Sequence, residues 1–173
     1  MRKVLRTAIA IESHIRGHIA LSRFAYYRIP LLGRAMSLAL DRLLLMTYGV
    51  DLVSSSIAVR KLSISHPGGI LLGGNGVVSD GRVAIMAGVK LVGRSPNDPE
   101  FVRRHRDRRV FVFGDNVVIG AGSTLIGPLD ICSNVLIGAM SLVNQSISEP
   151  GVYVGIPARR LHGTVTDEWV AHL

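Results

Sequence analysis

The sequence predicts a mainly β protein in which short parallel strands coil around a triangular core, preceded by an α-helical segment. Aliphatic residues recur every six positions in the C-terminal half, and the residues before Val50 show no strand alternation. Aromatic residues make up only 5% of the 173 residues, whereas glycine occurs 19 times. Small and branched side chains with frequent glycine suit tightly stacked strands. A chain of this length suits one compact domain.

Residues 1–49 are expected to form a helical segment with two helices, near 3–28 and 31–47. They are rich in Ala, Leu, Arg and Met, which are good helix formers, and Pro30 and Gly33 separate the two stretches. Apolar residues cover much of the second helix. Its surface is therefore expected to pack against another part of the protein.

The composition predicts a cytoplasmic protein. The N-terminus begins basic and then apolar, as signal peptides do, but charged residues soon interrupt the apolar run and no small-residue cleavage site follows. No stretch reaches 18 uncharged apolar residues. The single cysteine, Cys132, excludes an intramolecular disulfide and fits a reducing compartment.

The net charge of +8 is concentrated in two places and favours an anionic partner. Residues 1–50 hold eight basic and two acidic residues, a net +6, and a second basic cluster runs from Arg103 to Arg109. A peripheral contact of the basic N-terminus with a membrane is one such partner. Nucleic acid is disfavoured, because neither a nucleic-acid-binding motif nor interleaved aromatic residues accompany the charge.

A six-residue repeat defines the C-terminal half. Helices repeat near 3.6 residues and strands at 2, so a period of six belongs to neither. It is typical of a solenoid in which each six-residue unit forms one side of a triangular coil, and three units make an 18-residue turn. Residues 113–148 then form two turns. The first position of each unit is Phe113, Ile119, Leu125, Ile131, Ile137 and Val143, and a small or branched residue follows four places later at Val117, Ser123, Leu129, Val135, Ser141 and Ile147.

Upstream the repeat is less regular. Leu72 and Val78 fit it, one extra residue then shifts the phase, and Ile85 and Leu91 resume it.

A polar, charged segment with two prolines then interrupts the repeat at residues 94–109. We expect a loop that leaves the coil without breaking its stack, a kind of excursion that is often functional. The predicted coil domain thus spans residues 50–163, and residues 164–173 form a C-terminal tail.

Together with the repeat, the segments HPGGILLG at 66–73 and GVYVGIPARRL at 151–161 resemble the left-handed parallel β-helix (hexapeptide-repeat) acyltransferases. The resemblance covers about residues 15–163. It is greatest to the serine acetyltransferase-like branch, which includes polysaccharide-associated O-acetyltransferases. It implies a left-handed coil and acetyl transfer from acetyl-CoA to a hydroxyl or amine without a metal. It also implies a homotrimer with active sites between subunits.

The resemblance implies that His66 is the general base and that Asp51, which precedes it by almost one turn of the coil, orients it. A neutral imidazole can take the proton from an acceptor hydroxyl as the oxygen attacks the thioester, and a carboxylate stabilises the imidazolium that forms. Gly93 falls where the family's oxyanion-binding backbone N–H lies. Each residue also has a purely structural interpretation: His66 as a polar side chain at a turn, Gly93 as the glycine that opens the excursion.

The family also implies that acetyl-CoA lies along the late coils, where small residues let the pantetheine arm approach and the final arginines bind phosphates. The same glycines would equally suit sharp corners of the coil. The candidate cofactor-binding residues are Gly120, Ala121, Gly122, Gly138, Ala139, Ser141, Arg159 and Arg160.

The acceptor site departs from that of serine acetyltransferases. Their acidic residue directly before the base is Ser65 here, and their arginine–histidine pair falls near Arg108 and Arg109, with His105 displaced. Fewer carboxylates and more positive charge favour a hydroxyl of a neutral or anionic sugar. The residues therefore predict an O-acetyltransferase acting on a surface polysaccharide or its precursor.

Three alternatives remain: a serine O-acetyltransferase of cysteine biosynthesis, an amino-sugar N-acetyltransferase, and a non-catalytic solenoid scaffold. A zinc enzyme such as a γ-class carbonic anhydrase is disfavoured. It needs several converging histidines, and residues 50–160 contain only His66 and His105.

Overall fold

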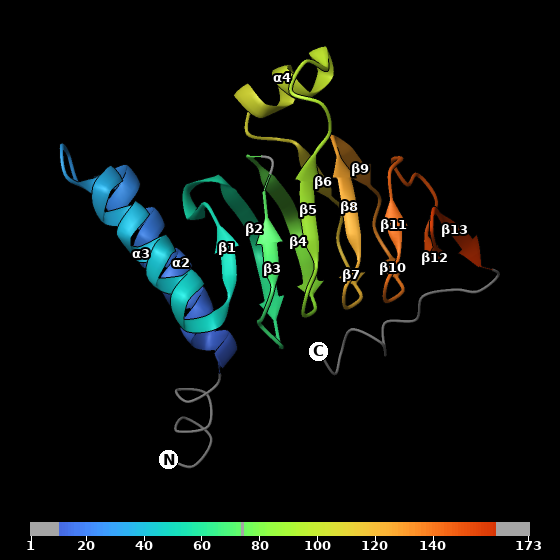
Figure 1. The fold of residues 1–173 in the computed structure, drawn as a ribbon, viewed down its shortest axis with the longest axis horizontal. Coiled ribbons are helices and arrows are strands. Elements are labelled where there is room, and N and C mark those ends of the chain that lie inside the picture. The colour runs from blue at the N-terminus through green and yellow to red at the C-terminus, as the bar shows by residue number, and fades with distance from the viewer. Residues whose placement is uncertain (1–10, 74, 162–173) are drawn as a thin grey trace.

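A computed structural model describes residues 11–73 and 75–161, which form a left-handed parallel β-helix with a helical hairpin at its N-terminal end (Figure 1). The hairpin consists of α2 (Ile11–Arg28) and α3 (Gly33–Tyr48). Two helices therefore form where the sequence predicts them. Part of the first predicted helix and all of the predicted C-terminal tail lie outside the described residues.

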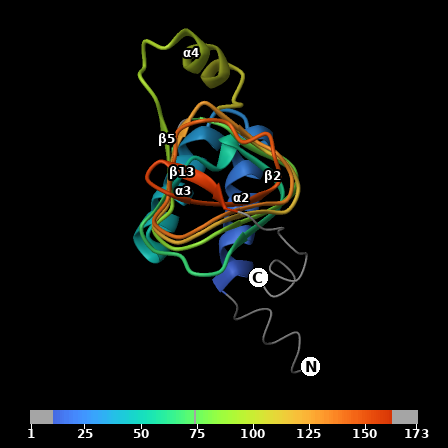
Figure 2. The same cartoon turned by 90° about the vertical axis from the view of Figure 1, so that its right-hand side faces the viewer.

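Seen along its axis, the coil is a rounded triangle of stacked turns (Figure 2). One side, which we call face A, is a five-stranded parallel sheet in the order β1-β3-β5-β8-β11. Its strands are β1 (Val50–Leu52), β3 (Ile70–Leu72), β5 (Lys90–Gly93), β8 (Thr124–Gly127) and β11 (Leu142–Val143).

The other two sides share long strands that bend at a corner. The first halves of β2 and β4 lie on one side with β6 and β9, and their second halves lie on the next side with β7, β10 and β12. Strand β13 pairs antiparallel with β12, and a 3₁₀ helix, η1, links β1 to β2. The bounds are η1 (Ser54–Ser56), β2 (Ile57–Ile64), β4 (Val77–Ile85), β6 (Phe111–Phe113), β7 (Val117–Ile119), β9 (Leu129–Ile131), β10 (Val135–Ile137), β12 (Gly151–Gly155) and β13 (Ala158–Leu161).

The six-residue repeat marks the inward positions of the coil. All twelve positions predicted to face inward between residues 113 and 148 are buried. Ile119 pairs with Ile137, which is the expected 18-residue turn. Because parallel pairing places each residue beside its equivalent on the next turn, these side chains stack into one continuous core.

Upstream, the predicted inward position of Val78 is wrong. Its side chain is half-buried and points outward, whereas Val77 is buried. The extra residue does exist, at the bend of β4, where the pairing of β2 with β4 shifts between Val59 and Lys61. Strands alternate with a period of two, so a one-residue error in placing the irregularity exchanges the two faces.

A buried polar network seats the hairpin on the coil. The Asp41 carboxylate of α3 accepts hydrogen bonds from the Ser22 hydroxyl of α2 (2.8 Å) and from the Ser54 backbone N–H of η1 (3.0 Å). The outer side of α3 stays uncovered, and Leu38 and Met46 are exposed. The packing expected for this apolar helix is therefore only partly provided within the described chain.

The excursion predicted as a loop contains a helix, α4 (Pro99–Arg106), and projects from the coil (Figures 1 and 2). The helix begins where the sequence supplies both usual signals. The Asp98 carboxylate accepts a hydrogen bond from the Glu100 backbone N–H (2.9 Å), and Pro99 occupies the first turn.

Candidate active site

Each turn of the coil enters face A through a corner with left-handed backbone. The residues there are Gly49, Gly69, Gly88, Gly122 and Met140, with φ between 57° and 71°. Consecutive corners are hydrogen-bonded: the Gly88 N–H donates to the Gly68 carbonyl and the Gly122 N–H to the Ala87 carbonyl. We call this column the glycine corner. Glycine dominates it because a side chain strains left-handed backbone.

His66 lies in the glycine corner of the first turn, and that corner is enlarged. Four residues separate Ile64 from Gly69, whereas two separate the equivalent Ile85 from Gly88. His66 is exposed. The candidate base therefore stands at an accessible edge, on a segment bent by Pro67 and two glycines.

The candidate cofactor residues occupy the same corner on later turns. They are Gly120, Ala121 and Gly122 on one turn, and Gly138, Ala139 and Ser141 on the next. Ser141 is buried and its hydroxyl accepts a hydrogen bond from the Gly155 N–H (3.2 Å), so it has a structural contact. The structure thus brings His66 and these small residues to one edge of the coil, with about 4.8 Å between successive turns.

Asp51 lies on β1 and pairs with Leu71, which follows it by 20 residues, whereas Thr124 pairs with Leu142, which follows it by 18. The first turn of the coil is therefore longer than this later one. The residue beside Asp51 on the next turn is thus Leu71, and His66 lies five residues before it, in the enlarged corner. Among the described residues, Asp51 makes no hydrogen bond to His66, and it lines a cavity of about 190 Å³ together with Tyr26 and other residues of the hairpin. The Asp51–His66 pair stays a prediction.

Gly93 lies at the opposite edge of face A from His66. The strands of face A begin at the glycine corner, and Gly93 is the last residue of β5. The Phe101 ring of α4 packs so closely on it that a Cβ there would displace the ring. The glycine therefore has a packing role, and the candidate oxyanion donor is separated from His66 by the width of face A within one chain.

The candidate acceptor residues are found near α4, beyond that same edge. Arg108 is tied to the hairpin: its guanidinium donates to the hydroxyls of Tyr27 (2.8 Å) and Tyr26 (3.1 Å). The hydrogen bond from Arg108 lowers the pKa of Tyr26. His105 and Arg109 are exposed, and Ser65, at the glycine corner rather than near α4, is half-buried beside His66.

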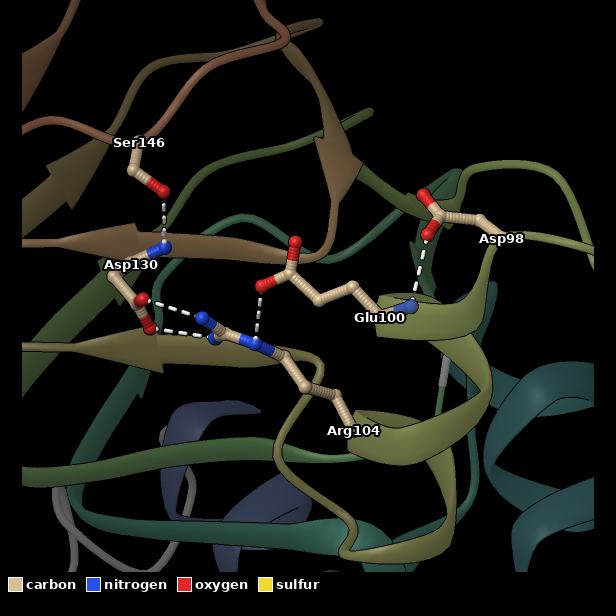
Figure 3. A network of polar contacts seen from close by, with 5 residues as sticks. All are labelled: Asp98, Glu100, Arg104, Asp130 and Ser146. Atoms are coloured by element: carbon tan, nitrogen blue, oxygen red, sulfur yellow. Dashed lines mark hydrogen bonds and ion pairs between the residues drawn. The ribbon is translucent and has the colours of Figure 1, made fainter.

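A second tie holds α4 against the coil (Figure 3). Arg104 donates two hydrogen bonds to the Asp130 carboxylate of β9 (2.7 and 2.6 Å) and a third to Glu100 (3.0 Å). The Arg104 guanidinium lowers the pKa of Asp130. Sequence reasoning missed both ties, because no motif signals contacts between residues so far apart in the chain.

The two terminal arginines differ in their freedom. Arg160 donates to the Glu149 carboxylate (3.0 Å) and to the Pro150 carbonyl (2.7 Å), so its guanidinium is engaged. Arg159 is exposed and, within the described part of the chain, donates only to the neighbouring Ala158 carbonyl. Of the pair, Arg159 is the better placed to meet a phosphate.

Two further observations concern cysteine chemistry and metal binding in the described chain. Burial raises the pKa of the Cys132 thiol, which disfavours the thiolate that a cysteine nucleophile needs. Within residues 11–73 and 75–161, no three histidine, cysteine or acidic side chains cluster as metal ligands would.

The coil, its corners and its excursion define a hexapeptide-repeat β-helix, the fold class of solved serine acetyltransferase structures. The serine acetyltransferase of Brucella abortus superposes with a TM-score of 0.71 over 91% of this chain and 59% of that one, at 22% identity. Its complex with coenzyme A gives the same TM-score of 0.71, with 91% and 58% covered, at 21% identity.

In sequence, the chain is 38% identical over 109 residues to the serine acetyltransferase of Staphylococcus epidermidis. The match covers 63% of this chain and 47% of that protein, so the chain spans about half the length of the curated relatives it matches. No family model matches the chain. None of the helices in the described part of the chain is long and apolar enough to cross a membrane.

Proposed function

We propose that the protein is an acetyl-CoA-dependent O-acetyltransferase and that its acceptor is the hydroxyl of serine. The observation that carries the proposal is the 38% identity to a serine acetyltransferase over a stretch of 109 residues. The shared fold and the coenzyme A complex of a structural neighbour support it. Ser65 and the basic excursion favour a sugar acceptor, whereas the relatives favour serine, an acceptor that the residues of the chain also leave open.

In the proposed mechanism, His66 accepts the proton of the acceptor hydroxyl while the oxygen attacks the thioester carbon. A tetrahedral oxyanion forms, then collapses and releases the coenzyme A thiolate, which takes up the proton from His66. The glycine corner leaves room for a pantetheine arm beside the base, because Ala121 and Ala139 are small exposed residues there, although the exposed Met140 lies over Gly122 on the last turn. A neighbouring carboxylate such as Asp51 would hold the imidazolium once it forms.

The candidate site consists of two halves, His66 with the glycine corner and Gly93 with α4, and their positions support a site shared between subunits of a homotrimer. Within one chain, His66 lies at the edge where face A begins, whereas Gly93 and α4 lie where it ends. Three or four residues per strand separate these edges by about 10–13 Å. A neighbouring subunit that presents its excursion to the glycine corner would bring the halves together.

The test is thiol release from acetyl-CoA by the purified chain, with serine, simple sugars, amino sugars and nucleotide sugars as acceptors. Turnover with serine is expected, and His66→Ala should lower it about 10²–10⁴-fold, the usual size of general-base catalysis. The control is Asp80→Ala, an exposed residue on a different corner of the coil.

Turnover with a sugar but not with serine would replace the acceptor and keep the reaction class. Absence of thiol release with every acceptor, or a His66→Ala protein as active as the wild type, would contradict the proposed mechanism.

A further inference from the structure

The turn between α2 and α3, residues 28–34, carries an apolar surface that folding does not explain. We call it the hairpin tip; it lies at the opposite end of the helix pair from Ile11, where α2 begins (Figure 1). Leu31 is fully exposed (101%) and Leu32 is 67% exposed. Leu31 also has left-handed backbone, with φ of 64°. Turns usually place Gly, Asn or Asp at such positions.

The leucines are exposed on a well-held turn. Gly33 packs so tightly on the Ala25 carbonyl that the two helices could not approach if it carried a Cβ. The Leu32 N–H donates to the Pro30 carbonyl (2.8 Å), and the Met36 N–H donates to the Leu32 carbonyl (2.9 Å). The tip therefore presents both leucines to solvent in a fixed geometry. Features that cost stability at one place point to a function there.

The surroundings of the tip are cationic. Arg28 and Arg34 flank the leucines and are exposed, and Arg34 lies 5.8 Å over the Tyr26 ring. The two acidic residues of the hairpin leave this charge uncompensated. Asp41 is buried in its hydrogen bonds, and Glu12 lies in the first turn of α2, at the other end of the pair.

We propose that the hairpin tip binds the surface of an anionic phospholipid membrane. Leu31 and Leu32 would enter the boundary between headgroups and acyl chains, while Arg28 and Arg34 meet lipid phosphates. Exposed apolar side chains between cations are what an interfacial anchor needs.

A second copy of the chain fits the tip less well. A two-fold contact would set Arg28 and Arg34 against their own copies. The proposal is independent of the acetyltransferase reaction, and it places the membrane contact at the tip rather than at the basic N-terminus that the sequence suggested.

The test is co-flotation of the full chain with phosphatidylcholine vesicles that contain phosphatidylglycerol as the minor lipid, and with pure phosphatidylcholine vesicles. The wild type should bind the anionic vesicles, at least tenfold more than the neutral ones, and lose binding as salt rises. Leu31→Ser with Leu32→Ser should reduce binding at least tenfold. Arg28→Gln with Arg34→Gln should do the same and flatten the salt dependence.

Two control variants remove the same kinds of side chain, two apolar and two cationic, at positions outside the hairpin tip. Ile156→Ser with Leu161→Ser removes two exposed apolar side chains at the other end of the coil, and Lys61→Gln with Lys90→Gln removes two exposed charges. Each should bind within twofold of wild type. Light scattering and circular dichroism on every variant check mass and fold.

Failure of the wild type to bind anionic vesicles at low salt overturns the proposal, as does equal loss in the controls. A lower mass of the leucine variant, without vesicle binding by the wild type, assigns the tip to contacts between copies instead.

Discussion

His66 and Asp51 show what a single residue's position can establish. The histidine lies on an enlarged, accessible corner, in line with the small residues of later turns. The aspartate lies on β1 without a hydrogen bond to it in the described structure. Residue types and spacing therefore agree with a base and its orienting carboxylate, whereas the described chain shows no hydrogen bond between the two, so the pairing stays a prediction.

We predict that His66 and Asp51 act as one catalytic unit. Asp51→Asn should lower turnover less than His66→Ala, and the double variant should be little worse than His66→Ala alone, because losses within one catalytic unit do not add. Steady-state kinetics of the four proteins measure the coupling, with Asp80→Asn as the control. Fully additive losses would mean that Asp51 acts separately, through the cavity it lines beside the hairpin.

Among the secondary-structure elements, α4 is held to the coil largely by polar side chains: none of its residues is fully buried, and the partly buried Phe101 adds an apolar contact with the core. Arg104 joins it to β9, and Arg108, just after it, joins the chain to the two tyrosines of α2. Both arginines belong to the basic cluster predicted to bind anions. The exposed Arg103, Arg106 and Arg109 remain for that role.

The Arg104–Asp130 pair predicts how docking of α4 depends on pH. Arg104 lowers the pKa of Asp130 below its ordinary value of about 3.9. The stabilisation is therefore fully present above that value and is lost as pH falls through the lowered pKa. Hydrogen exchange of α4, expressed as protection factors, should be constant near neutral pH and decrease below about pH 4.

The variant Arg104→Gln should show weak protection of α4 at all pH values, whereas Arg103→Gln should behave as wild type. Because Asp130 is half exposed, the effect should be small, about 0.2–1 kcal/mol. Identical pH profiles for wild type and Arg104→Gln would show that other contacts hold α4.

Two glycines of the hairpin differ in the space around them, and we predict opposite effects on stability when each is replaced by alanine. Gly17 lies within α2 with nothing near its missing Cβ, whereas Gly33 abuts the Ala25 carbonyl. Gly17→Ala should raise the free energy of unfolding by about 0.5–1 kcal/mol, the difference in helix propensity. Gly33→Ala should lower it by about 1–3 kcal/mol, because the helices must separate. Urea unfolding measures both, and stabilisation by Gly33→Ala would contradict the close approach.

For the whole molecule, two features favour assembly: the separation of His66 from Gly93 and α4, and the uncovered outer face of α3. Exposed apolar residues on α3, such as Leu38 and Met46, have no cover within the described part of the chain. Across a shared interface, the excursion of one subunit could face the glycine corner of the next. The described monomer alone provides no such arrangement.

We therefore predict a homotrimer, with a mass three times the 18.6 kDa of one chain. Light scattering at micromolar concentration measures it. Mixing His66→Ala subunits with subunits altered in the excursion should restore some activity, because some interfaces would combine two intact halves. A stable monomer with full turnover would rule out the shared site.

The sequence by itself determined the coil and its core. A period of six places every repeat position at the same point of a triangular turn, and burial of those positions follows from this geometry alone: all twelve repeat positions between 113 and 148 are buried. Helix formers and a proline–glycine break likewise determined the hairpin. The sequence also placed His66 at a turn, because Pro67 and two glycines dictate local backbone.

Only the tertiary structure decided which distant residues meet. The contact of Arg104 with Asp130 and that of Arg108 with Tyr26 depend on how the excursion folds back, and no periodic signal encodes this. The greater length of the first turn, set by the enlarged corner, decided that Asp51 pairs with Leu71. The tertiary structure also decided the separation of His66 from Gly93. The strands of face A run in one direction, so His66 lies at the edge where they begin and Gly93 at the edge where they end.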